Sequence, residues 1–97
     1  MDFILSLDEE LQLDILALFR RMEVNSFSLG TLSKKIKNIR NLFELRVKGK
    51  NVIIRLFYCY RKSKIIIILH GFVKKTQNIP SKELELAIKR KKEIENE

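Results

Sequence analysis

Four side chains able to bind a phosphate or move a proton fall within, or directly after, segments predicted to form β-strands. Arg46 lies on the polar side of one such segment, because a strand turns successive side chains to opposite faces. Arg55 stands within an otherwise apolar segment, where a guanidinium without a partner would be costly to bury. If the strands pair in register, one face of a sheet is bordered by Arg46, Arg55, His70 and Lys74.

A face of this kind suits RNA. A guanidinium pairs with two phosphate oxygens at once, and the rings of Tyr58 and Phe72 could stack on unpaired bases. Cleavage of RNA requires stabilisation of the charge that develops on the phosphate, which fixed cations supply. A lysine beside another cation has a lowered pKa, so Lys74 could transfer a proton.

Each of these side chains also has a structural interpretation. Arg55 could form an ion pair with Glu44 on the neighbouring strand, and spacing alone favours this as much as a catalytic role. A single histidine near a strand end, as His70 is, more often packs or forms a hydrogen bond than catalyses. The pair Lys74–Lys75 could protect a sheet edge from aggregation, and Cys59 is expected in the core.

Several classes of site and location are disfavoured. The sequence has no metal-ligand spacing, no glycine-rich phosphate loop and no convincing Ser/His/acid set, so we expect no metal and no cofactor. Its single cysteine cannot form an intramolecular disulfide and fits a reducing cytoplasm. The first residues do not resemble a signal peptide, and the longest apolar run, Ile65–Leu69, is too short to span a membrane.

Positive charge is concentrated in the middle of the chain. The net charge is +8, yet residues 1–24 are acidic and residues 83–97 are nearly neutral. Residues 25–82 carry fourteen Lys or Arg and one acid, Glu44. Such a stretch attracts a polyanion and neutralises its phosphates on contact. We favour this interpretation over a surface that is merely solvated.

A first helix is predicted after an N-terminal capping box, Ser6–Glu9, in which each side chain satisfies a backbone N–H of the other residue. One apolar face follows at helical spacing: Leu11, Ile15, Leu18, Phe19 and Met22. Leu13 and Leu16 lie off this stripe, so the helix could be contacted on two sides.

Residues 28–40 have the leucine and isoleucine spacing of a short second helix. The pattern then changes to period two at 43–48, which predicts a strand. A second strand at 52–60 is predicted from its β-branched and aromatic residues, and a third at 64–73 contains five consecutive apolar residues. The short turns between them imply antiparallel strands. Pro80 suits the first turn of a final helix, whose charged end, 89–97, is expected to project or fray. With 97 residues, the chain is expected to form a single domain, 1–97, of the α+β class.

Three stretches resemble the phage-derived HigB-like branch of the RelE/ParE toxin superfamily: Leu42–Arg46, Ile54–Tyr58 and Leu69–Pro80, followed by a helix with Glu85 and Ala87. The most specific part is HGFVKKTQ at His70–Gln77. The resemblance implies a RelE-like fold, in which a small twisted antiparallel sheet packs against N-terminal helices and a C-terminal helix follows. It also implies a toxin of a type II toxin–antitoxin system.

The activity implied by the resemblance is that of an mRNA interferase. Such a toxin is a metal-independent endoribonuclease that enters the ribosomal A site in the cytoplasm. It cuts mRNA by attack of a 2′-OH on the adjacent phosphate. The implied partner, besides mRNA on the ribosome, is a cognate helix-turn-helix antitoxin that keeps the toxin inactive; neither a membrane nor a small-molecule cofactor is implied.

The resemblance also assigns roles to individual residues. Arg46 matches the arginine of the ELR motif and would contact the scissile phosphate. Arg55 matches the arginine of a YR strand motif, although Ile54 stands here in place of the tyrosine. Lys74 and Lys75 match a basic pair and are candidates for phosphate binding and proton transfer. Further RNA contacts would come from Lys48, Tyr58, His70, Phe72 and Thr76.

Two departures from the superfamily leave alternatives open. Only residues 1–5 precede the capping box, where many members begin with a strand. In many members of the superfamily a Tyr or His near the C-terminus supports catalysis. No Tyr or His follows His70 here, so the resemblance does not identify the residue that acts as general base. One alternative is a ParE-like toxin that binds DNA gyrase without catalysis. The other is an inactive phage-derived protein whose basic face binds nucleic acid.

Overall fold

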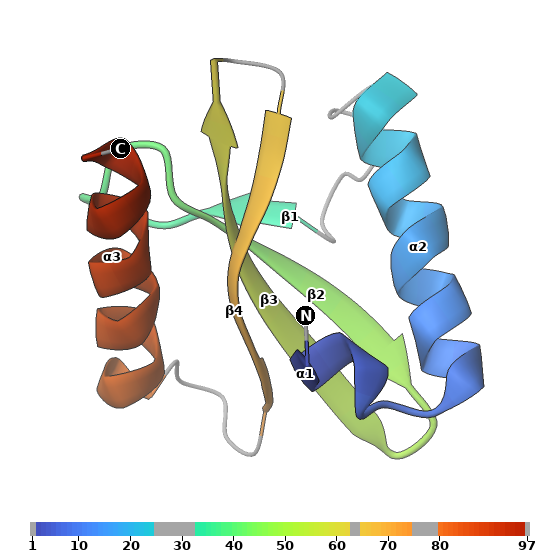
Figure 1. Cartoon of the computed structure of the whole chain (residues 1–97). Helices are drawn as coiled ribbons and strands as arrows, with labels where there is room; N and C mark the ends of the chain where they lie inside the picture. Colours follow the sequence, from blue (N-terminus) through green and yellow to red (C-terminus); the bar gives the residue numbers. More distant parts are fainter. Residues whose placement is uncertain (1, 25–32, 63–64, 75–79, 97) are drawn as a thin grey trace.

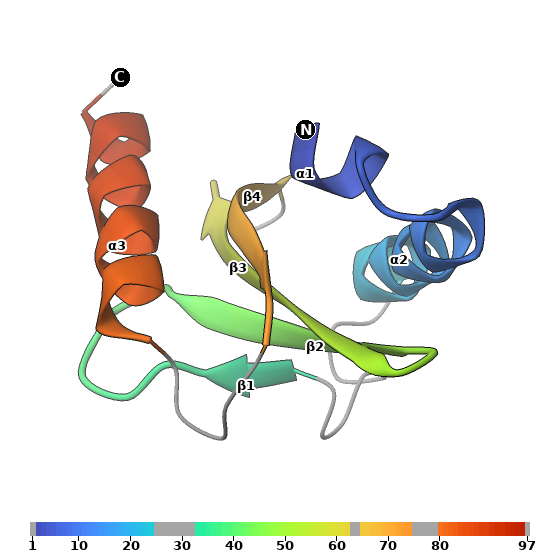
Figure 2. The same cartoon turned by 90° about the horizontal axis from the view of Figure 1, so that it is seen from below.

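The computed structural model describes residues 2–24, 33–62, 65–74 and 80–96. In chain order these residues form α1 (Asp2–Leu5), α2 (Glu9–Val24), β1 (Ser33–Lys35), β2 (Phe43–Gly49), β3 (Val52–Arg61), β4 (Ile65–Val73) and α3 (Ser81–Glu95). The strands form one antiparallel sheet in the order β1-β2-β3-β4. The helices α2 and α3 lie on either side of this twisted sheet (Figure 1 and Figure 2). The predicted α+β class is confirmed.

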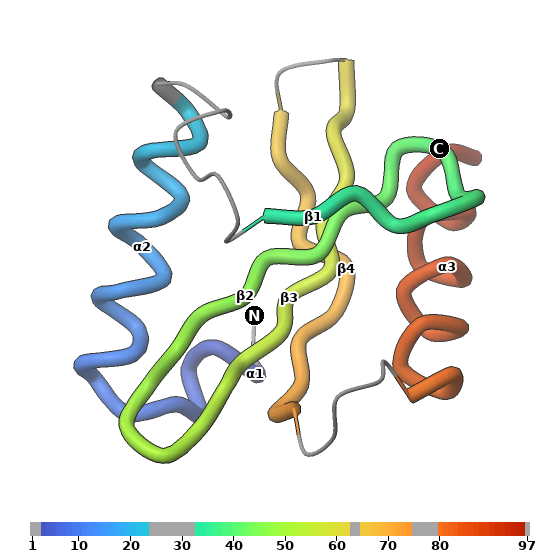
Figure 3. Tube along the Cα trace, turned by 180° about the vertical axis from the view of Figure 1, so that it is seen from behind, coloured from blue at the N-terminus to red at the C-terminus, as the bar shows by residue number. Residues whose placement is uncertain are grey.

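The β2–β3 hairpin fixes the register on which the candidate site depends. A two-residue turn, Lys50–Asn51, connects the strands, and Asn51 has a φ of 60°. Asparagine tolerates this left-handed conformation, which suits the tight turns of hairpins. Because the turn is so short, it places Arg46 directly opposite Arg55. The hairpin extends well beyond the short β1 (Figure 3), so the Arg46 end of β2 has no outer neighbour among the described strands.

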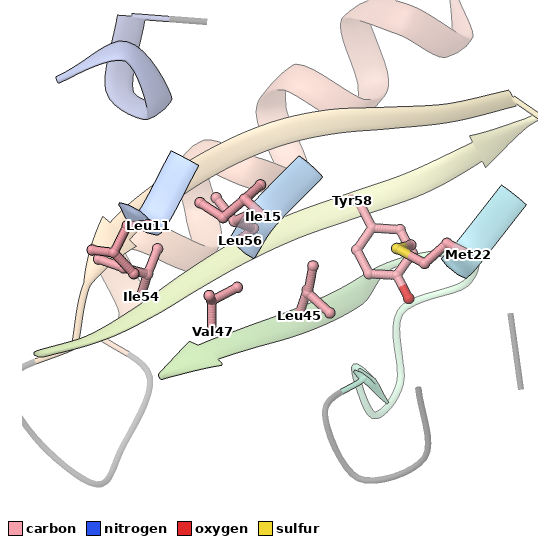
Figure 4. Close-up of a cluster of buried hydrophobic side chains, with 8 residues drawn as sticks. All are labelled: Leu11, Ile15, Met22, Leu45, Val47, Ile54, Leu56 and Tyr58. Atoms are coloured by element: carbon pink, nitrogen blue, oxygen red, sulfur yellow. The ribbon is translucent and has the colours of Figure 1, made fainter. Parts of the chain in front are cut away.

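The helix α2 covers one face of the sheet with the apolar stripe that the sequence predicts. Side chains from α2, β2 and β3 form a buried cluster: Leu11, Ile15, Met22, Leu45, Val47, Ile54, Leu56 and Tyr58 (Figure 4). Full burial of a Leu or Ile side chain contributes about 1.5–3 kcal/mol. This cluster is therefore what holds α2 to the sheet.

The start of α2 differs from the prediction. Asp8, not Ser6, caps the helix: its Oδ1 accepts a hydrogen bond of 2.9 Å from the backbone N–H of Leu11. The Ser6 hydroxyl instead donates to the Phe3 carbonyl of α1 at 2.6 Å. The predicted capping box is wrong, because residues 2–5 form a separate short helix and the Ser6 side chain forms its hydrogen bond with that helix.

A bulge in β4 turns two consecutive residues toward α3. Phe57 pairs with His70, whereas the next residue, Tyr58, pairs with Ile68, so Leu69 is the extra residue between them. Leu69 packs in the core beneath α3, and His70 forms hydrogen bonds with α3. The alternation of a regular strand would have sent these two side chains to opposite faces.

The helix α3 packs on the other face of the sheet, over β3 and β4. The buried cluster on this side consists of Ile36, Leu42, Phe57, Cys59, Leu69, Phe72 and Ala87. Cys59 is a buried core residue, as predicted. The expectation that 89–97 frays is wrong for the described part, because α3 continues to Glu95. Lys91 is only 8% exposed, and its amine pairs with Glu95 at 2.6 Å.

The predicted second helix over 28–40 is wrong where the chain is described, and residues 28–32 lie outside the described ranges. Residues 33–35 form β1, which pairs with β2, and left-handed turns follow at Asn38 and Asn41. Asn41 also exchanges two hydrogen bonds, of 2.8 and 3.0 Å, with the backbone of Tyr60. These side-chain contacts satisfy the backbone in place of a helix. The predicted strands are confirmed as β2, β3 and β4, and β1 adds a fourth.

Candidate nucleic-acid interface

Three cationic side chains from β2, β3 and the end of β4 converge on the sheet face opposite α2. Arg46 pairs across the strands with Arg55, and Arg55 pairs with Phe72, so these three side chains share one face. Lys74 continues β4, and its N–H donates to the carbonyl of Ile53 at 2.7 Å. By strand alternation its side chain lies on the same face as Phe72.

The charges on this face act on Lys74. The pKa of the Lys74 amine is lowered most by loss of contact with water, and the neighbouring charges of Arg55 and Arg46 lower it further. Lys34 of β1 acts in the same direction, whereas Glu44 opposes the shift. All these charged groups therefore surround one small area of the sheet, where positive charge prevails.

A buried ion pair lies within this area. The Arg55 guanidinium contacts the Glu44 carboxylate, and the two side chains are 11% and 2% exposed. The structural interpretation of Arg55 is thus confirmed as a contact. Within the described part of the chain, Glu44 Oε2 and Arg55 Nε have no hydrogen-bond partner. Because Arg55 is buried and paired, the side chains better placed to reach a phosphate are the exposed Arg46 and the half-buried Lys74.

Residues 2–92 match the family described as phage-derived protein Gp49-like. The chain belongs to this family. Gp49-like proteins form part of the RelE/ParE-like toxin group, so the predicted resemblance is confirmed at that level, while the HigB-like branch stays a prediction. No curated protein and no solved structure matches the chain.

In this Gp49-like chain, His70 connects the sheet to α3. Its Nε2 lies 2.5 Å from Glu83 Oε2, and its Nδ1 lies 3.3 Å from a nitrogen of Arg90. Because a guanidinium only donates, Nδ1 must accept, and Nε2 then carries the hydrogen that Glu83 accepts. Arg90 also donates to the Leu69 carbonyl at 2.8 Å. Both ring nitrogens of His70 are occupied, as expected for a histidine with a hydrogen-bonding role.

The two aromatic residues expected to stack on bases differ in position. Tyr58 lies on the α2 face and is 2% exposed, with its hydroxyl 2.5 Å from Ser33 Oγ and its ring stacked on Phe43 at 5.3 Å. Burial raises the pKa of this hydroxyl. Little of the ring is therefore accessible to a base, and a contact of Tyr58 with RNA stays a prediction. Strand alternation already places Tyr58 on the same side as Leu56.

Phe72 lies on the predicted face but is largely covered. Its ring is 9% exposed and stacks between Phe57, at 5.6 Å, and His70, at 6.0 Å. This stack leaves little of the ring for a base. The contribution of Phe72 is to fill the sheet face between the cations and α3.

Of the other residues predicted to contact RNA, the structure describes one, Lys48. Lys48 is exposed, and lies two residues beyond Arg46 on the same face of β2. Lys75 and Thr76 lie outside the described ranges. Lys34, opposite Glu44 in the register, joins the face but is absent from the predicted set. It was missed because a strand of three residues is too short to show an alternating pattern.

In the four described ranges, no group of His, Cys, Asp or Glu is arranged to hold a metal ion. The helices of those ranges include none with the length and apolar character needed to cross a membrane.

Proposed function

We propose that this chain is the toxin of a type II toxin–antitoxin system and that it cleaves mRNA on the ribosome. The observation that carries the proposal is the convergence of Arg46, Arg55 and Lys74, from neighbouring segments of the sheet, on one face on which Arg46 is exposed and Lys74 is half-buried. Membership of a family in the RelE/ParE-like toxin group supports it. The HigB-like activity and the partner, a helix-turn-helix antitoxin, belong to the same proposal.

The proposed reaction is an internal transfer at phosphorus. The 2′-oxygen of the ribose attacks the adjacent phosphate, a P–O2′ bond forms, and the P–O5′ bond breaks. The products are a 2′,3′-cyclic phosphate and a 5′-hydroxyl, and the proton lost by the 2′-OH balances the one gained by the leaving oxygen. Arg46 binds the non-bridging oxygens, whose negative charge increases in the transition state.

Proton transfer is assigned to the lysine side of the face. The pKa of Lys74 is lowered by loss of contact with water and by Arg55 and Arg46, so its neutral amine forms at a lower pH than that of a free lysine. That amine accepts the 2′-OH proton, and Lys75 is the second candidate. His70 is less suited, because both of its ring nitrogens are already engaged by α3.

The proposal is tested with purified protein and translating ribosomes programmed with a defined mRNA, with cuts mapped by primer extension. Arg46→Ala is expected to lower the cleavage rate by about 100-fold or more, since one transition-state cation contributes on that order. Arg46, Arg55 and Lys74 are together called the cation face. Lys92→Ala is the matched control: it removes an exposed positive charge of α3 that is not among the charges acting on Lys74, and should leave the rate unchanged.

Two results would reject the nuclease. Intact mRNA after incubation with wild-type protein would exclude cleavage. Equal rates for Arg46→Ala and wild type would show that the cation face is not the site. Inhibition of gyrase supercoiling without RNA cleavage would favour the ParE-like alternative, and absence of growth arrest on expression would favour an inactive protein.

A further inference from the structure

The outer side of α2 carries exposed leucines that the proposed function does not use. Leu13 and Leu16 are 61% and 53% exposed, whereas the inner stripe of the same helix is buried. No other described element covers this side of α2 (Figure 1 and Figure 2). Exposed leucines on one side of a helix, next to each other, are typical of an interaction surface.

Charged residues flank the two leucines at coiled-coil spacing. The stripe Glu9, Leu13, Leu16 and Arg20 has intervals of four, three and four residues, which are those of the core positions of a heptad. Glu9 and Arg20 are exposed, and neither side chain has a hydrogen bond or ion pair within the described ranges. The stripe is therefore apolar at its centre, negative at one end and positive at the other.

We propose that two copies of this chain associate through antiparallel contact of their α2 helices. In the register centred on the leucines, Leu13 faces Leu16 of the partner subunit, and Glu9 faces Arg20 of the partner subunit. A two-fold axis repeats each contact, so the same surface serves both copies. In both halves of the contact, each leucine therefore packs against a leucine and each charged residue faces the opposite charge.

The charge pattern favours a second copy over other arrangements. Parallel association would set Glu9 against Glu9 and Arg20 against Arg20, which is repulsive. An unrelated partner would need the reverse charge pattern on its own helix, whereas a second copy supplies it by symmetry. Arg46 belongs to the sheet face opposite the buried cluster under α2. Arg46 and Lys48 also line a pocket beside α2, together with Ala17 and Arg21, but Leu13 and Leu16 are not part of its lining.

The contact is small, and the affinity should be modest. Two helices of this length that meet along one stripe bury less than a standard interface, so we expect a dissociation constant of about 10–100 µM. Sedimentation velocity of the full chain, from about 1 to about 500 µM, brackets that range. The wild type should change from monomer to dimer across the series.

Variants test the stripe and its charges. Leu13→Ser should weaken association by about 100-fold, because it removes an apolar contact from both copies. Glu9→Arg should weaken it by about tenfold, and adding Arg20→Glu should restore it, because the swapped charges are again complementary. Glu85→Arg makes the same charge change on an exposed position of α3 and should have no effect. Thermal unfolding of each variant confirms that it is folded.

A crosslinking experiment tests the register. When Leu13→Cys and Leu16→Cys proteins are mixed under oxidation, the disulfide between different variants should exceed those between identical ones. The native Cys59 is buried and should not interfere. A chain that stays monomeric throughout the series would overturn the proposal, as would failure of the charge swap to restore association. A monomer that instead binds a neighbouring helix-turn-helix protein through Leu13 and Leu16 would assign the surface to that partner.

Discussion

The ion pair between Glu44 and Arg55 provides the sharpest test of how the cation face is built. Glu44→Gln keeps the shape of the side chain but removes its charge, and so leaves the 11% exposed guanidinium of Arg55 without a counter-ion. Loss of one partner from a buried pair costs about 3–5 kcal/mol. Because glutamine retains an oxygen that can accept from Arg55, we expect about 3 kcal/mol. In a chain of 97 residues this corresponds to a fall in Tm of about 12–24 °C.

A double-mutant cycle separates the pair from the general effect of each substitution. Urea unfolding of Glu44→Gln, Arg55→Gln and the double variant should give a coupling free energy of about 2–3 kcal/mol, because the double variant leaves no uncompensated charge. Lys34→Gln is the control: its side chain is exposed on the same face, and its effect should stay within about 0.5 kcal/mol. If the losses of unfolding free energy in the two single variants add up in the double variant, the ion pair is not what stabilises the buried Arg55.

The same substitution has a second consequence for catalysis. Glu44 raises the pKa of Lys74 and opposes the loss of contact with water and the two arginines, which lower it. Removal of the Glu44 charge should therefore lower that pKa further. If the neutral amine of Lys74 accepts the 2′-OH proton, the rise of the cleavage rate with pH should move to lower pH in Glu44→Gln. An unchanged pH profile in a folded variant would show that Lys74 is not the group that titrates.

Other substitutions test separate parts of the structure. Lys74→Arg keeps a positive charge but not a titratable amine, so the rise of cleavage rate with pH should disappear; a wild-type profile would contradict the assignment. Gly71→Ala should lower the free energy of unfolding by about 1–3 kcal/mol, because a Cβ would come within 2.5 Å of the Phe3 ring; an unchanged Tm would show that α1 moves aside. Asp8→Ala should cost about 1 kcal/mol through loss of the α2 cap, and more than Ser6→Ala.

Much of the candidate site could be predicted from local sequence. Period-two alternation identifies β2, and β-branched, aromatic and apolar runs identify β3 and β4; the two-residue turn then determines that Arg46 opposes Arg55. Alternation also places Lys74 on the same side as Phe72. The pairing of Arg55 with Glu44 was an open alternative, because spacing shows that two side chains are neighbours but not how deeply they are buried.

Other features depend on tertiary contacts that the sequence does not display. The bulge that turns both Leu69 and His70 toward α3 is a property of the pairing between two strands. The length of α3 was underestimated because its end looks polar, whereas Lys91 buries its aliphatic stem and pairs its amine with Glu95. The strand β1 could not be predicted, because the spacing of Leu and Ile before and after it is that of a helix. In the structure, left-handed turns at Asn38 and Asn41 exclude a helix there.

The position of Glu44 explains why a strongly basic face can exist on so small a sheet. Like charges directly opposite each other on neighbouring strands are destabilising, and Arg46 and Arg55 stand in that relation. Glu44 is the single acid in residues 25–82, and it lies two residues from Arg46 on the same face, in contact with Arg55. It neutralises the buried arginine, while the exposed Arg46 and the half-buried Lys74 remain outside that ion pair. The face therefore stays positive toward an incoming phosphate without placing unpaired charge in the core.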